Sequence, residues 1–111
     1  MSINYSGCLF SEPISLTIWQ APSVSGIYAI LVPDSQARPK PFRVVYFGEA
    51  GNLSTRGIGR SHHKYNDWLQ QGGTLLSNLY IAIYPTLNFT EQQRLALEAQ
   101  LIRDYRPACN D

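Results

Sequence analysis

The sequence has 111 residues, a formal net charge of +1, 44% apolar residues and 15% charged residues. This length suits one domain with one hydrophobic core, and the apolar content excludes a disordered chain. No apolar run approaches the roughly 20 residues that a membrane span requires. The N-terminal residues lack the basic start and apolar stretch of a signal peptide. We therefore expect a cytoplasmic protein that has no membrane partner.

The first 24 residues are the least regular part of the chain, and we expect them to form an N-terminal extension packed on a domain of residues 25–111. Within the extension, residues 14–19 alternate between apolar and polar, which suits a strand or a short helix. Two runs rich in β-forming residues follow at 26–32 and 42–48. The three prolines between 33 and 41 predict a loop, so the two runs should form an antiparallel hairpin.

The second half of the chain alternates between helix and strand signals. Four glycines within 48–59 predict an irregular segment or an interrupted helix start, and a helix is expected over 61–71. Alternation over 78–84 predicts a third strand. Thr90 and Gln93 have the spacing of a capping box, so a last helix should run from there to about Tyr105, before Pro107. The expected order of elements is therefore strand, strand, helix, strand, helix.

Positive charge is concentrated in one segment although the net charge is low. Residues 38–64 contain one anion, Glu49, and six cations: Arg38, Lys40, Arg43, Arg56, Arg60 and Lys64. A local basic patch is enough to attract phosphate groups. A solvated loop and helix face would give the same pattern, so charge alone does not decide between the two interpretations.

Glu98 occupies an unexpected place on the last helix. At 100° per residue it lies in the middle of an arc of apolar side chains: Leu95, Leu97, Leu101, Ile102 and Tyr105. A carboxylate on a core-facing stripe is costly unless it is paired or bound to a cation. It either pairs with Arg94 at i−4 or binds a divalent metal ion, since one carboxylate with waters and a substrate phosphate is a normal arrangement for Mg²⁺.

The chemistry-bearing residues occur in a distinctive order. Gly26-Ile27-Tyr28 in the first strand precedes Tyr46-Phe47-Gly48 in the second, and Arg56, His62-His63, Glu98 and Asn110 follow. A single strand tyrosine usually only packs. The ordered set, however, resembles the GIY-YIG nuclease superfamily over residues 25–110, through SGIYAI, VVYFGEAGNLSTR and LEAQLIRDYRPACN. The last piece is especially similar to the end of the nuclease domain in bacterial excision-repair members.

The resemblance implies an α+β fold, in which a small three-stranded antiparallel sheet is flanked by helices. It also implies an endonuclease that hydrolyses DNA phosphodiester bonds with a single Mg²⁺ or Mn²⁺ ion. It implies that Tyr28 and Tyr46 are the two motif tyrosines, that Arg56 is the catalytic arginine and that Glu98 binds the metal. These residue types suit the reaction, because a phenol oxygen can take a proton from the attacking water and a guanidinium donates to the charged phosphate. Either tyrosine can be the base in this interpretation.

Basic and polar residues near the site are candidates for DNA contact. Asn110 matches the asparagine that closes the motif, and we assign it, with Arg60 and Lys64, to nucleic-acid binding. A different alignment of the sequence with the family motif makes Arg60 the phosphate-binding arginine. Glu49 departs from the pattern, since it stands where the repair nucleases carry a lysine.

The two histidines leave a further alternative. If the helix extends back over residues 56–67, then Arg56, Arg60 and His63 share one stripe, whereas His62 faces apolar neighbours. We therefore favour His63 over His62 as the catalytic partner. Both can also be plain surface or packing residues.

Two other functions remain as rivals to the nuclease. One is a nucleic-acid-binding module on the same fold that has lost hydrolysis, which Glu49 and the low net charge favour. The other is a protein-interaction scaffold. For the nuclease, the sequence shows no helix-turn-helix or zinc module, so specificity should come from DNA shape, a partner protein or self-association. Trp68 and Tyr65 have rings that can stack on bases, but a helix aromatic is more often core.

Overall fold

The computed structural model describes residues 2–37 and 41–110, so Arg38 and Lys40 of the basic segment lie outside the described residues. The regular elements in chain order are β1 (Ile3–Tyr5), β2 (Cys8–Phe10), β3 (Ile14–Ser15), β4 (Gly26–Pro33), β5 (Phe42–Ala50), η1 (Leu53–Thr55), α1 (Tyr65–Gln71), η2 (Leu76–Asn78), β6 (Tyr80–Pro85) and α2 (Glu91–Tyr105). This is the predicted α+β class.

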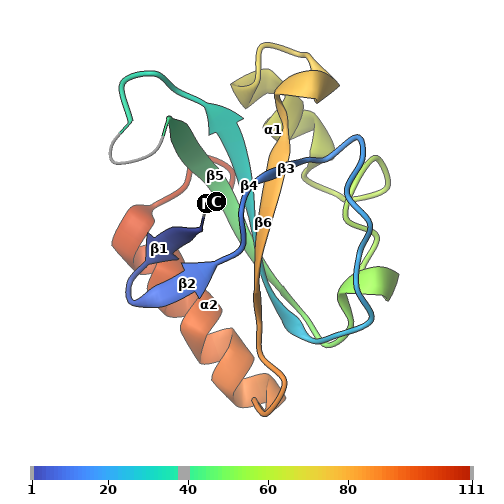
Figure 1. The fold of residues 1–111 in the computed structure, drawn as a ribbon, viewed down its shortest axis with the longest axis vertical. Coiled ribbons are helices and arrows are strands. Elements are labelled where there is room, and N and C mark those ends of the chain that lie inside the picture. The colour runs from blue at the N-terminus through green and yellow to red at the C-terminus, as the bar shows by residue number, and fades with distance from the viewer. Residues whose placement is uncertain (1, 38–40, 111) are drawn as a thin grey trace.

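The main sheet is antiparallel and has the strand order β3-β6-β4-β5 (Figure 1). The prediction of three strands was wrong, because Ile14 and Ser15 pair with β6 and add a fourth strand at its open edge. That strand is short because the chain turns back immediately, with the backbone N–H groups of Ile18 and Trp19 both donating to the Ser15 carbonyl. The predicted hairpin of β4 and β5 is present, with β4 in the interior of the sheet.

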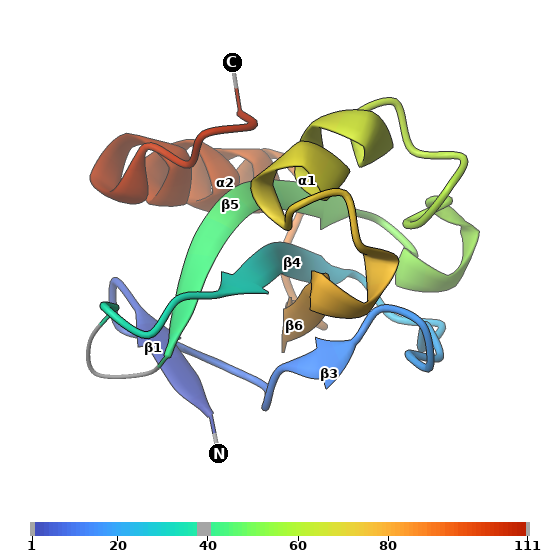
Figure 2. The ribbon, with the colours of Figure 1, turned by 90° about the horizontal axis from the view of Figure 1, so that it is seen from above.

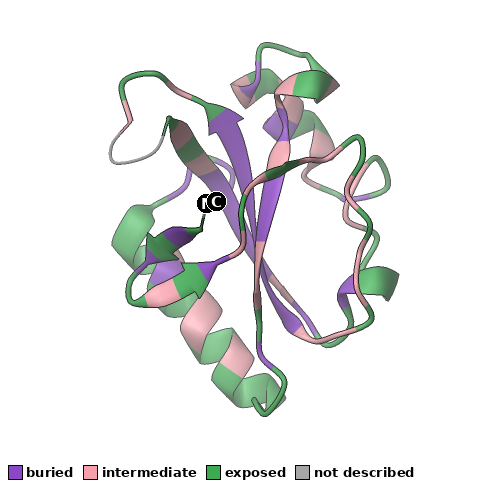
Figure 3. Cartoon of the chain, viewed as in Figure 1, coloured by how far each residue is buried: buried purple, intermediate pink, exposed green. Residues whose placement is uncertain are grey.

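Apolar side chains are buried on both faces of the sheet, which explains why β4 is an almost continuous apolar run. Figure 3 shows the buried residues concentrated along the central strands. On one face α1 contributes Trp68 to a cluster with Ile30 and Val45. On the other, α2 contributes Leu101, and the β1–β2 hairpin contributes Phe10. The two helices therefore cover opposite faces, as the view from above shows (Figure 2).

Helix α2 begins as the sequence predicts. The Thr90 hydroxyl accepts from the Gln93 backbone N–H at 3.1 Å, and the Gln93 side chain accepts from the Thr90 N–H at 2.8 Å. The predicted apolar arc is too wide, because Leu95 is 44% exposed and Tyr105 is 39% exposed. Only Leu101 is fully buried on this helix. Neither α-helix among the described residues has the length and apolar content for a membrane crossing.

Candidate active site

The two motif tyrosines lie on the same face of neighbouring strands. Tyr28 of β4 is paired in register with Gly48 of β5, two residues along from Tyr46. Their ring centroids are 6.0 Å apart, and both side chains are buried. A Cβ atom at Gly48 would collide with the Tyr28 ring and hydroxyl, so only glycine fits at this position. The glycine that follows Tyr46 in the sequence thus makes room for the other tyrosine.

His62, rather than His63, contacts the tyrosines. Its Nε2 atom lies 2.9 Å from the Tyr28 hydroxyl oxygen, and its ring meets the Tyr46 ring edge-on at 5.4 Å. His62 is 5% exposed, whereas His63 is exposed and only stacks on His62, with centroids 4.6 Å apart. Trp68 packs on the His62 ring at 4.5 Å and is fully buried, so it belongs to the core and offers no face to a base.

The preference for His63 rested on a helix over residues 56–67, and that helix does not form. Helix α1 begins only at Tyr65, and the preceding residues turn irregularly. Gly57 and Gly59 both have positive φ, at 74° and 154°, which breaks any helical stripe between Arg56 and His63.

Hydrogen bonds fix the tautomer of His62. The Lys64 backbone N–H donates to Nδ1 at 3.0 Å, so Nδ1 carries a lone pair. Burial, and then the charges of Arg56, His63 and Lys64, lower the pKa of His62 to about 4, so the ring is neutral at neutral pH. The remaining proton therefore lies on Nε2, and this group donates to the Tyr28 oxygen.

The hydrogen bond between the two tyrosines shifts their pKa values in opposite directions. Burial raises the pKa of Tyr28 above its ordinary value, and a hydrogen bond with Tyr46 raises it further. Burial and then the Glu98 charge raise the pKa of Tyr46, but Arg56 and the hydrogen bond with Tyr28 oppose this rise. The interaction between the two phenols thus favours the neutral form of Tyr28 and the anionic form of Tyr46. The anionic form is therefore better supported at Tyr46.

Two acids lie side by side near these phenols. Burial raises the pKa of the half-buried Glu98 carboxyl, and the neighbouring Glu49 carboxylate raises it further. Arg94 does not pair with Glu98. Its Nε donates to the Glu49 carboxylate at 3.1 Å, in an ion pair whose side chains are only 12% and 20% exposed. Glu49, in place of a lysine, thus brings an arginine into the site from the facing helix.

The chemistry of Glu98 fits a divalent cation. No cluster of three or more His, Cys, Asp or Glu side chains in the described part of the chain is arranged to hold a metal. Mg²⁺, however, is often bound by one or two carboxylates that share it with waters and phosphate oxygens. The Glu98 anion is disfavoured by burial and by Glu49, and a divalent cation relieves both effects. The residues present therefore suit a site with a single carboxylate ligand.

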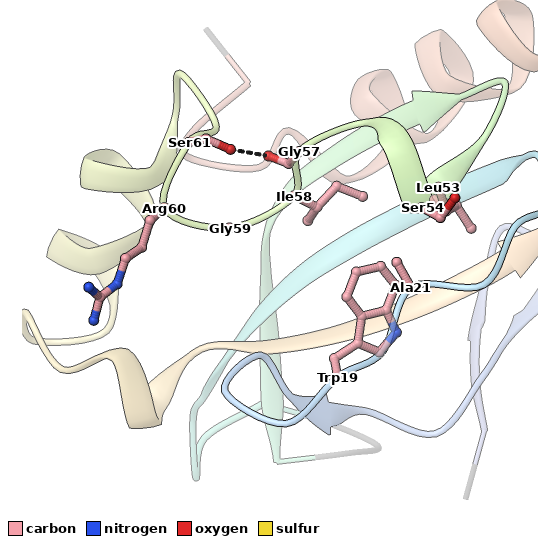
Figure 4. A pocket seen from close by; sticks show the side chains of 9 residues that line it. All are labelled: Trp19, Ala21, Leu53, Ser54, Gly57, Ile58, Gly59, Arg60 and Ser61. Atoms are coloured by element: carbon pink, nitrogen blue, oxygen red, sulfur yellow. Dashed lines mark hydrogen bonds between the residues drawn. The ribbon is translucent and has the colours of Figure 1, made fainter.

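Arg56 belongs to this cluster by its electrostatic effect. It is exposed, follows directly after η1, and its charge lowers the pKa of Tyr28, Tyr46, His62 and Glu98. Arg60 lies instead in the loop that lines a neighbouring pocket (Figure 4). Lys64 forms an ion pair with Asp67 at 3.7 Å. Of the two arginines, Arg56 is therefore the one whose charge acts on both tyrosines.

Asn110 holds the edge strand in place. Its side-chain oxygen accepts from the Phe47 backbone N–H, and its amide nitrogen donates to the Phe47 carbonyl, both at 2.8 Å. The adjacent Cys109 backbone N–H donates to the Val45 carbonyl at 2.9 Å. These bonds flank Tyr46 on both sides. The geometry thus engages Asn110 in positioning β5, which differs from the expected contact with nucleic acid.

Comparison with known proteins identifies the fold. No family model matches the chain. The chain is 33% identical over 110 residues to the UvrABC system protein C of Rickettsia prowazekii (strain Madrid E), a match that covers 99% of this chain and 15% of that protein. The chain therefore spans only a small part of the length of this relative.

Solved structures of the GIY-YIG N-terminal endonuclease domain of UvrC from Thermotoga maritima are also similar. A point mutant bound to its catalytic divalent cation matches with a TM-score of 0.56 and 22% identity, over 86% of this chain and 91% of that one. The magnesium-bound domain matches with a TM-score of 0.54 and 22% identity, over 82% and 88%. The likeness shows that the two chains share one fold.

Proposed function

We propose that this chain, which has the fold of a GIY-YIG domain, is a divalent-metal-dependent endonuclease that hydrolyses phosphodiester bonds in DNA. The observation that carries the proposal is the contact of Tyr28, Tyr46 and His62 within electrostatic range of Arg56 and Glu98. They come from two strands, a loop and a helix, so their meeting is a product of the fold. The similar Thermotoga maritima domain is an endonuclease bound to magnesium, which supports the same class of cofactor here.

We infer that Tyr46 is the general base. His62 donates from Nε2 to Tyr28, and Tyr28 donates in turn to Tyr46, so the relay leaves the Tyr46 oxygen as the acceptor at its end. A water molecule attacks phosphorus in line, Tyr46 in its anionic form takes the water proton, and the bond from phosphorus to the leaving oxygen breaks, with its electron pair going to that oxygen. Arg56 donates to the phosphate oxygens as their charge grows.

The metal acts by its charge. When Mg²⁺ or Mn²⁺ is held at Glu98, it supplies positive charge that favours the Tyr46 anion and stabilises the phosphate. Burial of Tyr46 works in the opposite direction, since it raises the pKa of this hydroxyl. The cation, Arg56 and the Tyr28 hydrogen bond are the three features that oppose it.

The proposed substrate is DNA, and the proposed place of action is the cytoplasm. We infer that specificity comes from DNA structure, a partner protein or self-association, as expected for a small nuclease domain. The specific feature that favours the rival, a binding module without hydrolysis, is Glu49 with its ion pair to Arg94. In that case Glu49 stands where a lysine would help to activate the base, and no reaction follows.

Nicking of supercoiled plasmid tests the proposal. Wild type, Glu98→Gln and the exposed control Glu91→Gln on the same helix are compared with Mg²⁺, with Mn²⁺ and with chelator. We expect metal-dependent nicking that falls by about 100-fold or more in Glu98→Gln, because even groups that only orient a metal ligand are worth about 10- to 100-fold. Glu91→Gln should nick as wild type does.

The other outcomes distinguish the rivals. Equal nicking by wild type and Glu98→Gln would remove the site from the reaction. DNA binding without nicking in every variant would support the silent module, and neither binding nor nicking would support the scaffold.

A further inference from the structure

A pocket of about 420 Å³ opens directly beside the catalytic cluster. Three segments line it: Trp19 and Ala21 of the N-terminal extension, Leu53 and Ser54 of η1, and the loop of residues 57–61 (Figure 4). The loop connects Arg56 to His62, and both of these residues belong to the cluster. The volume of the pocket lies within the roughly 300–1,000 Å³ that is typical of small-ligand sites.

The walls of the pocket suit a flat ring. The Trp19 indole, which is half-buried, lies across from the loop in Figure 4. Ile58 and Leu53 add apolar surface, and Ser54 contributes a hydroxyl. The loop presents little side-chain bulk, because Gly59 has open space where a Cβ atom would lie. An indole opposite a loop of two glycines and one apolar side chain is an arrangement in which a base can stack.

Arg60 lies at the border of this pocket and its guanidinium points away from the indole (Figure 4). Because Arg60 is exposed, its positive charge faces the solvent outside the pocket. Arg56 offers a second cation at the other end of the same loop. A pocket that has one arginine in its lining, and a second next to that lining in the chain, suits a nucleotide strand, whose bases alternate with phosphates.

We propose that this pocket receives one unpaired nucleobase of the strand that is cut, stacked on Trp19. The inference rests on the proposed nuclease function and adds a substrate class, which is DNA with an unpaired nucleotide beside the cleaved bond. An unpaired base enters most readily, because a paired base must first be unstacked at a cost of a few kcal/mol. The pocket thus selects for distorted DNA.

The test measures binding with fluorescein-labelled duplexes. One duplex carries a single bulged nucleotide, and its twin carries an abasic residue at the bulge. Affinities are measured in the Glu98→Gln background, which prevents cleavage. We expect the base-containing duplex to bind about tenfold or more tightly, as stacking on aromatic side chains provides. Trp19→Leu should abolish this difference, and Trp19→Phe should keep most of it.

A second variant and a second signal protect the test from unfolding. Ala21→Phe keeps Trp19 but fills the pocket, so it should also abolish the difference, with circular dichroism unchanged. Because Trp68 is fully buried, emission that iodide can quench comes from Trp19, and bulged DNA should shield it. Retained discrimination in Trp19→Leu, or equal affinity for both duplexes in the starting protein, would overturn the proposal.

The two proposals fail in different ways. Plasmid nicking without base discrimination would end the pocket assignment and leave the nuclease intact. Base discrimination without nicking would keep the pocket and end hydrolysis. If Trp19 is shielded from iodide by a second copy of the chain, and not by DNA, the pocket is a protein interface and the pocket assignment is refuted.

Discussion

The neutral, buried His62 makes the stability of the protein depend on pH. Its pKa is about 4 in the folded protein, against an ordinary value of 6.5 that applies to the unfolded chain. Between these values the unfolded chain binds a proton that the folded protein does not, so the free energy of unfolding falls as the pH falls. At about 1.36 kcal/mol per pH unit, the full loss by pH 4 is about 3 kcal/mol. This is a large part of the about 5–15 kcal/mol of a typical domain.

Urea unfolding between pH 7.5 and pH 4 measures this effect in wild type, in His62→Gln and in the exposed control His63→Gln. The carboxyl groups titrate in all three proteins and largely cancel in the comparison. We expect wild type and His63→Gln to lose stability steadily below pH 6.5. His62→Gln should be less stable at pH 7.5, but its free energy of unfolding should depend less on pH. An equally steep decline in His62→Gln would refute the assignment of a neutral His62 to the Tyr28 hydrogen bond.

Three further substitutions test the frame of the site. Gly48→Ala places a methyl group in the Tyr28 ring, so it should cost about 1–3 kcal/mol of stability by urea unfolding; an unchanged midpoint would contradict the close packing. Arg94→Gln should cost about 1–3 kcal/mol of stability in the same assay, because it leaves Glu49 unpaired. The double variant with Glu49→Gln should recover part of this loss. Asn110→Ala removes both bonds to the β5 backbone and should speed amide exchange of that strand, with unchanged exchange as the opposing result.

Long elements with strong local signals were predictable from the sequence. Strands β4 and β5 are dense in β-forming residues, and the capping box at Thr90 marked the start of α2. The β1–β2 hairpin was not predicted, since its strands have only three residues each. Its turn at Ser6-Gly7, where both residues have positive φ, is the one local signal for it.

The candidate site was predictable only where regular structure places the side chain. Sheet register brings Tyr28 and Tyr46 to one face, and helix α2 brings Glu98 to the border of the core. His62 lies in an irregular loop, where helical periodicity does not apply. The Glu49–Arg94 pair was not predictable either, since it joins two elements whose relative placement depends on tertiary packing.

The cluster draws on β4, β5, the loop before α1, and α2, so its members are as many as 70 positions apart in the chain. Contacts of such long range form late in folding, because closing each loop costs entropy before any contact repays it. The hydrogen bond between His62 and Tyr28 also forms only once the sheet and the loop have met. A half-folded chain therefore lacks the assembled cluster, so the proposed nuclease activity is expected only from a molecule whose fold is complete.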